Sequence, residues 1–566
     1  MPDHILFLVP PPIRYADYIH PAYNTKTSHR GEKIRGNVVT DMPLGVLSMS
    51  SYVKAHQPVA VKLIDFSTIL NKLVDFPFDS FEQFFTHQLS KEEVIDFKPT
   101  IIGISVLFTP AYPNLIALAK VSRTLFPDAL LLAGGGVPQN VARNLFQDFP
   151  GIDGICHGEG EKPLLALLRA PDQRRFLLES SSWITPADSP GVMYQHDFIE
   201  NLDEIPFYDY DLCQIDDYSI NPAITSFYST GTTVAESANF HIMTSRGCPQ
   251  HCTFCASHTI HGRVMRYFSV ARVREDFFRL KNAYGAKQLI FQDDHFMGDV
   301  ERALEIIRMI AEMEGVRPVF QNGLALYALK RNVLEALLEA GVEQLTLPVE
   351  SGNQKVLKRL MKKPLSLNIV RRVVDDCRDL GIYTNLNILI GMPGESQEDM
   401  REAADFLKSL NANWFVIMFA TPLVGSEMLE ICLEKDYLVA SHIDTDYKKA
   451  IVRTEHFDTE SIHAIAYSMN LELNFVANPD MRLGQYDLAL VGFHGALKAK
   501  EDHLFAHYFA GRCQELLGRE EDAERHYLRA GELLEGSTFW RAHADRFGLT
   551  DEITQRMGAR GGALPG

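Results

Sequence analysis

The sequence predicts an α/β protein in three parts: a Rossmann-like parallel sheet, a partial (β/α)6 barrel and an all-α C-terminal tail. Two series of short apolar runs separated by helical patterns indicate two parallel sheets, because parallel strands need crossover helices between them. Residues 481–566 have helical patterns without a strand signal. With 566 residues, 46% of them hydrophobic, the chain is long enough for several domains with cores of their own.

The first series predicts a doubly wound domain over residues 1–170. Helical stretches such as Pro113–Phe126 separate apolar runs that have the length and flanking residues of buried strands. The five predicted strands are His4–Pro10, Ala60–Phe66, Thr100–Phe108, Ala129–Gly136 and a short run within Gly151–Glu161. Ligands of such sheets bind beyond the carboxyl ends of the strands. Residues 171–235 are rich in turn residues and are interpreted as a connector.

The second series predicts an open barrel over residues 236–430, because six βα units are too few for a closed eight-fold barrel. Polar or glycine residues follow the strands, at the end where barrels place their chemistry. The six predicted strands are Asn239–Ser245, Gln288–Asp294, Arg317–Gly323, Gln344–Ser351, Tyr383–Gly391 and Trp414–Ala420.

Residues 431–480 are an extension to which the sequence assigns no role. In the tail, residues 481–566, the spacing of Gly511, Gly518, Ala523, Tyr527 and Ala530 fits a TPR-like helical repeat with a period of about 34 residues. One repeat and part of another are too few to stand alone. We therefore expect the tail to dock on the barrel or on a protein partner.

Composition excludes several classes of protein. The formal net charge of −18 argues against nucleic acid as a partner. No apolar run is long enough to span a membrane, and the N-terminus lacks the features of a signal peptide. Scattered cysteines indicate buried, reduced thiols and hence a cytoplasmic location. They are Cys156, Cys213, Cys377, Cys432 and Cys513.

Three other cysteines, Cys248, Cys252 and Cys255, lie within eight positions just after the first predicted barrel strand. Thiolates so close together usually hold a metal. The C-x3-C-x2-C spacing differs from the paired C-x2-C motifs of structural zinc sites. A cluster bound by three thiolates keeps one iron open for a ligand. Zinc remains an alternative, with a fourth ligand from His251, His258 or His261.

This motif, with Phe254 directly before the last cysteine, resembles that of the radical S-adenosylmethionine (SAM) enzymes. The resemblance implies that Cys248, Cys252 and Cys255 hold a [4Fe-4S] cluster whose open iron binds SAM. It also implies an external electron donor of the flavodoxin or ferredoxin type, and cleavage of SAM to a 5′-deoxyadenosyl radical. Residues matching the family's SAM positions are Phe254, Asp293, Asn322, Glu350, Ser351, Ile390 and Gly391. Asp293 and its neighbour Asp294 are expected to point into the barrel mouth.

Upstream of such a barrel, the N-terminal domain resembles a cobalamin (B12)-binding domain, so that the resemblance covers about residues 1–430. It implies cobalamin as a cofactor, with glycines that let the backbone approach a bulky corrin. The matching residues are Pro43, Gly45, Asp65, Ser105, Gly134, Gly135, Gly136, Gly158, Glu159 and Gly160. The D-x-H-x-x-G motif, whose histidine binds cobalt in other cobalamin domains, is absent.

Together the two resemblances imply an enzyme that methylates an unactivated carbon of a small-molecule or carrier-bound substrate through methylcobalamin. One alternative is a cobalamin-dependent radical SAM cyclase or ring-rearranging oxidase without methyl transfer. Another is a cobalamin-binding regulatory protein whose tail engages a partner, although a pure sensor has no need of an open iron. Candidate proton-transfer groups are His258, His261, Tyr267 and His295, and the sequence assigns none of them as catalytic.

Overall fold

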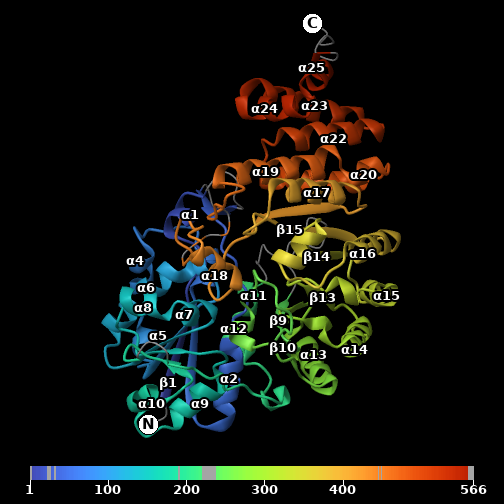
Figure 1. Ribbon diagram of the computed structural model, residues 1–566. Helices are drawn as coiled ribbons and strands as arrows, with labels where there is room; N and C mark the ends of the chain where they lie inside the picture. The colour runs from blue at the N-terminus through green and yellow to red at the C-terminus, as the bar shows by residue number, and fades with distance from the viewer. Residues whose placement is uncertain are drawn as a thin grey trace.

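The computed structural model of the chain describes residues 3–21, 27–30, 33–188, 192–218, 238–443, 445, 447 and 449–558. Residues 219–235 of the predicted connector and 559–566 of the predicted tail lie outside this description. Figure 1 shows the N-terminal domain beside the barrel, with the tail stacked on one end of the barrel. No helix within the described part of the chain is long and apolar enough to cross a membrane.

The N-terminal domain is a six-stranded sheet in the order β4-β1-β5-β6-β7-β8, with the last strand antiparallel. The five predicted strands are all present. They are β1 (Asp3–Val9), β4 (Val59–Asp65), β5 (Ile101–Ser105), β6 (Leu130–Gly134) and β7 (Gly154–Cys156). The sixth, β8 (Trp183–Ile184), is too short to show a period in the sequence, and a separate hairpin is formed by β2 (Thr27–Arg30) and β3 (Lys33–Gly36).

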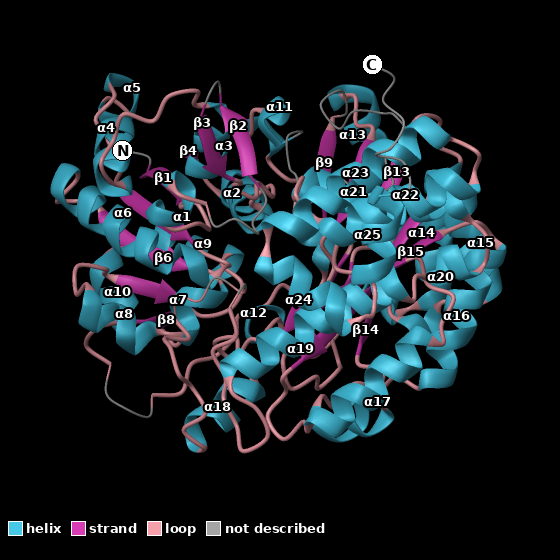
Figure 2. Cartoon of the chain, turned by 90° about the horizontal axis from the view of Figure 1, so that it is seen from above, coloured by secondary structure: helices cyan, strands magenta, loops and turns pink. Residues whose placement is uncertain are grey.

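Helices cover both faces of this sheet, as Figure 2 shows from above. They are α1 (Tyr15–Ile19), α2 (Leu44–His56), α3 (Phe66–Lys72), α4 (Phe81–Leu89), α5 (Glu92–Ile95), α6 (Tyr112–Leu125), α7 (Gly136–Asn140), α8 (Ala142–Asp148), α9 (Glu161–Arg169) and α10 (Gln173–Glu179). The face covered by α2 and α9 shares one continuous hydrophobic core with the barrel. Apolar packing therefore holds the barrel against this face of the sheet.

The barrel contains the six predicted parallel strands as two three-stranded sheets, β9-β12-β13 and β14-β15-β16. The strands are β9 (Asn239–Ile242), β12 (Gln288–Phe291), β13 (Arg317–Phe320), β14 (Gln344–Glu350), β15 (Tyr383–Ile390) and β16 (Trp414–Phe419). The described residues form no ladder between β13 and β14. Each of these strands contains a proline, Pro318 or Pro348, which has no N–H to donate.

Helices on the outside of the barrel follow the first five strands in the expected alternation. They are α13 (Val270–Tyr284), α14 (Val300–Ala311), α15 (Arg331–Glu339), α16 (Leu367–Asp379) and α17 (Gln397–Lys408). Three further helices contact the N-terminal domain: α11 (Ile215–Tyr218) before β9, α12 (His258–His261) after Cys255, and α18 (Glu427–Glu434) after β16. A π-helical turn, η7 (Val356–Leu360), follows β14, and a short hairpin pairs β10 (Ser245–Arg246) with β11 (Arg266–Tyr267).

The extension after β16 runs back over the N-terminal domain. Val424 and Leu429 are buried in the core of that domain. Farther along, the Thr109 hydroxyl donates to the Thr445 carbonyl at 3.1 Å and lies 2.8 Å from the Tyr447 hydroxyl. The extension therefore ties the barrel to the outer face of the first sheet.

The tail packs on the barrel together with the end of the extension, as its few repeats require. The extension forms α19 (Thr459–Leu471), the π-helix η8 (Glu472–Val476) and the start of α20 (Pro479–Arg482). The tail continues with α21 (Tyr486–Ala499), α22 (Leu504–Leu516), α23 (Glu520–Gly536), α24 (Thr538–Arg546) and α25 (Thr550–Gly558). Their core includes Tyr383 and Trp414 of the last two barrel strands. The fold class predicted from the sequence is thus confirmed.

One side chain of the extension supplies hydrogen-bond partners for the open edge of the last barrel strand. Asn474 is fully buried, accepts from the Phe415 N–H and donates to the Phe415 carbonyl, both at 2.8 Å. It therefore occupies the place of a further strand at the edge of the open barrel, where unpaired backbone groups are costly.

We expect Asn474→Ala to lower the free energy of unfolding by about 2–4 kcal/mol, because it leaves two buried backbone groups without partners. Urea unfolding followed by circular dichroism measures the change. Asn332→Ala, on the exposed face of α15, is the matched control and should cost nothing. Equal midpoints for the two variants would contradict this role of Asn474.

Candidate active site between the two α/β domains

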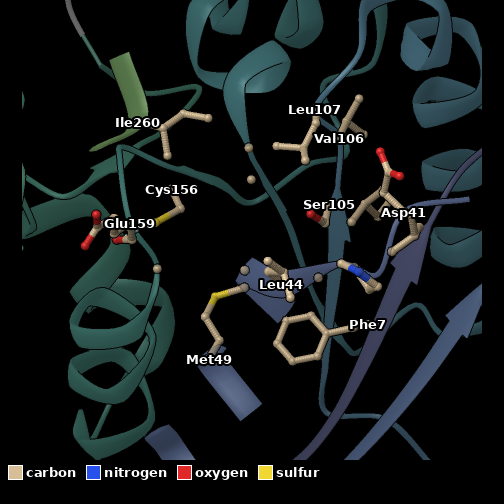
Figure 3. A pocket seen from close by; sticks show the side chains of 18 of the residues that line it. Phe7, Asp41, Leu44, Met49, Ser105, Val106, Leu107, Cys156, Glu159 and Ile260 are labelled. Carbon is tan, nitrogen blue, oxygen red and sulfur yellow. Dashed lines mark hydrogen bonds between the residues drawn. The ribbon is translucent and has the colours of Figure 1, made fainter. Parts of the chain in front are cut away.

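A cavity of about 460 Å³ lies between the carboxyl edge of the N-terminal sheet and the barrel. The sheet contributes strand-end residues such as Ser105, Gly134 and Cys156, and the barrel contributes Arg246 and Ile260. Figure 3 shows these two sides facing one space. Doubly wound sheets bind ligands at this edge.

Most residues of the predicted cobalamin set line this cavity. They are Pro43, Gly45, Asp65, Ser105, Gly134, Gly135, Gly158, Glu159 and Gly160. Gly136 does not line it. A Cβ at Gly136 would lie 3.2 Å from Cδ1 of Ile260, so this residue instead lets α7 approach α12 of the barrel.

Two of these glycines leave bare backbone at the cavity wall. A Cβ at Gly45 would meet no atom within 4 Å, and at Gly134 the nearest atom would be Cβ of Cys156 at 3.8 Å. Gly135 has a φ of +96°, and a Cβ there would lie 2.4 Å from the Val106 carbonyl oxygen. The wall can therefore accept a flat, bulky group close to the backbone.

Asp65 lies at the cavity, but local groups already use its carboxylate. It accepts from the Ser67 N–H at 2.9 Å as the N-cap of α3 and from the Tyr218 hydroxyl at 3.0 Å. Burial raises the pKa of Asp65 to about 6, and these hydrogen bonds oppose the rise. Asp65 therefore helps to shape the wall as well as to line it.

A buried ion cluster joins the two domains beside the cavity. Arg246 of β10 lies 2.9 Å from Glu159 and 2.7 Å from Glu161, both on the N-terminal domain. Arg266 of β11 lies 2.5 Å from Glu159, and His261 of α12 lies 2.8 Å from it. The cluster thus connects the glycine-rich turn after β7 with the hairpin that flanks the cysteine loop.

At Glu159 the effect of the neighbouring positive charges outweighs the effect of burial. Burial alone would raise its pKa, but the charge of Arg246 and hydrogen bonds from His261 and Arg266 hold the pKa well below its usual value. The Glu159 carboxylate is therefore ionised in the folded protein. It was predicted as a cobalamin contact. In the structure it joins the two domains through ion pairs at the rim of the cavity.

The cysteine loop runs between β10 and α12. Cys248, Cys252 and Cys255 are unpaired and half-buried. Thr253 fixes the loop, since its N–H donates to the Met361 carbonyl at 3.0 Å and its hydroxyl to the Leu360 carbonyl at 2.7 Å. Phe254 is partly buried against the barrel core. The loop is thus anchored while its thiols stay accessible.

The three thiols influence one another electrostatically. Burial raises the pKa of Cys248 and, to about 11, that of Cys252, and neighbouring cysteines of the loop contribute to both rises. In the described chain no three His, Cys, Asp or Glu side chains converge as the ligands of one metal ion. A cubane cluster makes no such demand, because each thiolate binds a different iron. The donor set fits a cluster better than a mononuclear zinc site.

Of the two carboxylates expected in the barrel mouth, only Asp294 lines the cavity. Asp293 is buried and accepts from Thr244 N–H at 3.1 Å and from the Ser245 hydroxyl at 2.6 Å. The prediction that both face the mouth was wrong, because neighbours along an extended chain point to opposite sides. Oδ2 of Asp294 is buried without a hydrogen-bond partner, and Asn322 also lines the cavity.

Glu350 closes β14 in an unusual backbone conformation, with a φ of +68°. Its carboxylate lies 3.4 Å from the Lys363 ammonium, and burial raises its pKa while the Lys363 charge lowers it. Lys363 also lowers the pKa of Cys252, so the three groups are neighbours. The adjacent Ser351 is buried, and its hydroxyl accepts from the Asn353 N–H at 3.1 Å.

Ile390 and Gly391 end β15. Gly391 has a φ of +87°, and its N–H donates to Oε2 of the buried Glu395 at 2.8 Å. Burial raises the pKa of Glu395 to about 7, against the hydrogen bonds from Met392 and Gly391. Both residues are buried at this tight turn, and neither Ile390 nor Gly391 lines the cavity of Figure 3.

Sequence reasoning missed Arg246, Arg266 and Lys363. The partners of Arg246 and Arg266 lie 85 or more residues away in the sequence. Lys363 pairs with Glu350, 13 residues before it, and a lone basic residue in a loop carries no local signal of such a pair. A further pair, Tyr327 and His295, lies near the cysteine loop with Oη and Nε2 separated by 2.7 Å. Desolvation raises the pKa of Tyr327, and the charge of Cys248 adds to the rise. His295 was among the predicted proton-transfer candidates.

Two family models match the chain. That of the radical SAM superfamily covers residues 242–407, and that of the B12 binding domain covers residues 83–168. The first therefore includes the cysteine loop and four complete barrel strands, β12 to β15, and the second ends within α9.

Similar curated proteins include the cytidylyl-2-hydroxyethylphosphonate methyltransferase of Streptomyces wedmorensis, 28% identical over 70% of this chain and 80% of that protein. The anaerobic magnesium-protoporphyrin IX monomethyl ester cyclase of Rubrivivax gelatinosus is 24% identical over 70% of this chain and 66% of that protein.

Two solved structures show the same fold. The radical SAM methyltransferase TsrM of Kitasatospora setae, with cobalamin and a [4Fe-4S] cluster bound, has a TM-score of 0.56 and 15% identity, over 94% of this chain and all of that one. The cobalamin-dependent SAM radical enzyme OxsB, with aqua-cobalamin bound, has a TM-score of 0.59 and 16% identity, over 99% of this chain and 84% of that one.

The ion cluster predicts a pH dependence. The folded pKa of Glu159 lies below its reference value of 4.5, so its stabilisation is complete above that pH and is lost as pH falls below it. We expect Glu159→Gln to lower stability at pH 7 by about 3–5 kcal/mol, because it leaves buried guanidinium groups uncompensated. The variant should also lose stability less steeply than the parent between about pH 5 and pH 3.

Urea unfolding of the apoprotein across this pH range measures both effects. Glu339→Gln, an exposed position on α15, is the control and should follow the parent. Parallel curves of unfolding free energy against pH for the parent and Glu159→Gln would rule out this role of Glu159 in joining the two domains.

Proposed function

Because the chain belongs to the radical SAM enzymes that carry a B12-binding domain, we propose that it methylates an unactivated carbon atom of its substrate with the help of cobalamin. The observation that carries this proposal is the shared cavity, whose walls come from the predicted cobalamin residues on one side and from the barrel beside the cysteine loop on the other. A methyl carrier and a hydrogen-abstracting centre must both reach one substrate carbon. A space between the two domains meets that need.

We propose that Cys248, Cys252 and Cys255 hold a [4Fe-4S] cluster. Their accessible thiols and the anchored loop support this assignment. The glycine-lined wall around Gly45 and Gly134 fits cobalamin. When bound, the cluster supplies the electron that cleaves SAM, and cobalamin supplies the methyl carrier.

Residues of this chain would hold SAM from several strand ends. Asp294 has a buried oxygen atom free to accept from the amino group, and Lys363 can pair with the carboxylate. We propose that the predicted SAM residues Phe254, Asn322, Glu350, Ser351, Ile390 and Gly391 surround the methionine and adenosine. Asp293 supports this site from inside the barrel wall through its hydrogen bonds to Thr244 and Ser245.

No histidine from the first domain lines the cavity within the described chain. The cavity histidine is His261, which is paired with Glu159. The exposed apolar side chains of Leu107 and Phe108 lie at the end of β5 instead. This wall therefore offers cobalamin packing rather than an imidazole ligand, as the missing D-x-H-x-x-G motif implies.

The anaerobically purified, reconstituted protein should contain about four iron atoms and one cobalt atom per chain after it is supplied with hydroxocobalamin. Cys252→Ala should lose most of the iron and all SAM cleavage, because one thiolate of the triad is missing. Cys432→Ala removes a fully buried thiol on α18 and is the control. Zinc in place of iron would refute the cluster.

The products identify the reaction. Methyl transfer by this chemistry consumes two SAM molecules and forms equal amounts of S-adenosylhomocysteine and 5′-deoxyadenosine. Deoxyadenosine alone, with no methylated product, would instead support the cyclase or oxidase chemistry that the similarity to the Rubrivivax cyclase leaves as the second candidate. Mass spectrometry with methyl-labelled SAM measures both products.

A larger residue at the bare wall should exclude cobalamin. We expect Gly45→Leu to weaken hydroxocobalamin binding at least about tenfold without loss of iron, because its side chain would project into the open cavity. Gly536→Leu, at an equally open position at the end of α23, is the matched control. Absorbance titration measures the affinity, and equal affinities for the two variants would remove cobalamin from this wall.

A further inference from the structure

A strongly basic segment lies next to the cysteine loop of an acidic protein. Residues 355–363 carry five cations and no carboxylate, whereas the whole chain has a formal net charge of −18. Four of these cations are exposed around η7 and form what we call the basic ridge: Lys355, Lys358, Arg359 and Lys362. The fifth, Lys363, points inward to Glu350.

Two members of the basic ridge are held by surface ion pairs. Lys355 lies 2.9 Å from Asp399, and Lys362 lies 2.5 Å from Glu427. Lys358 and Arg359 have no carboxylate partner among the described residues. An anionic surface that covers these two exposed cations would break no existing ion pair, so pairing with them costs little free energy.

The basic ridge is connected directly to the cysteine loop. The backbone carbonyls of Leu360 and Met361, which follow Arg359, accept both hydrogen bonds of Thr253. Thr253 directly follows Cys252 in the chain, so these two hydrogen bonds join the basic ridge to the cysteine loop. A partner seated on the basic ridge would therefore lie beside Cys252, with one hydrogen-bonded turn between them.

We propose that the basic ridge is the docking surface for an acidic electron-carrier protein with a flavin or an iron–sulfur centre. This inference rests on the proposed function, which requires an electron at the cysteine loop. In the docked complex one electron passes from the reduced carrier to this protein, the carrier is oxidised by one electron, and no atom is transferred.

Electrostatics favours this partner over other anions. An acidic carrier and an acidic enzyme repel one another at long range, so a local positive surface selects the one orientation that brings the two centres together. Nucleic acid would need neutralising cations over a wider surface, which the net charge of −18 does not offer.

The test is binding of oxidised bacterial flavodoxin to the reconstituted protein, measured by surface plasmon resonance at about 50 mM salt. The variant Lys358→Glu/Arg359→Glu should weaken binding at least about tenfold, and Lys358→Ala/Arg359→Ala by a smaller factor. Binding by the parent should weaken as salt rises. The matched control Lys498→Glu/Arg546→Glu makes the same charge change on exposed tail helices and should bind within about twofold of the parent.

Equal affinities of the two charge-reversed variants would overturn the proposal. So would a single-stranded RNA that binds the parent and not the ridge variant, while flavodoxin binds both alike. SAM cleavage driven by dithionite separates this inference from the proposed function, because the chemical reductant needs no docking surface. The ridge variant should keep that activity and lose flavodoxin-driven cleavage. Absence of dithionite-driven cleavage in the parent would instead contradict the proposed function.

Discussion

The ion cluster of Glu159, Glu161, Arg246, Arg266 and His261 is the constraint on which the active-site arrangement depends. Apolar packing between α2, α9 and the barrel brings the two domains together but does not set their register, since hydrophobic contacts are weakly directional. Charged groups in a dry interface must find their partners in one geometry. The cluster therefore aligns the turn after β7 with the hairpin beside the cysteine loop. This alignment sets the shape of the cavity between them.

The open barrel is a second constraint. Six strands leave an edge at β16, and the chain covers it with Asn474 and the tail rather than with further strands. The extension after β16 then ties the same end to the first sheet through Thr109 and Tyr447. Residues 431–480, to which the sequence assigned no role, thus hold the two halves together at a second place besides the ion cluster.

Much of the fold could be predicted from the sequence, because each buried strand is a continuous apolar run with turn residues at its ends. The pattern failed for β8, which is only two residues long. Side-chain direction at strand ends was harder. Asp293 and Asp294 look equivalent in the sequence, and only their surroundings show that one braces the wall while the other faces the cavity.

Contacts between distant segments could not be predicted at all. Arg246 and Arg266 pair with Glu161 and Glu159, which lie 85 and 107 residues away along the chain, and nothing near them in sequence indicates charge pairing. The prediction that Gly136 contacts cobalamin found no support for a related reason. It continues a run of glycines, yet its lack of a side chain serves contact with Ile260 of the other domain rather than a ligand.

The two-sided cavity has a consequence for how the protein is made. Its walls include Arg246 and Ile260 as well as the N-terminal strand ends, so the first domain alone has an incomplete wall. Synthesis proceeds from the N-terminus, and domains generally fold as units while the chain grows. The first sheet can form early, but the space enclosed with the barrel is complete only after the cysteine loop and β11 have left the ribosome. The order of translation therefore sets the order of folding. The sheet that supplies most of the lining forms first, and the cavity is completed later.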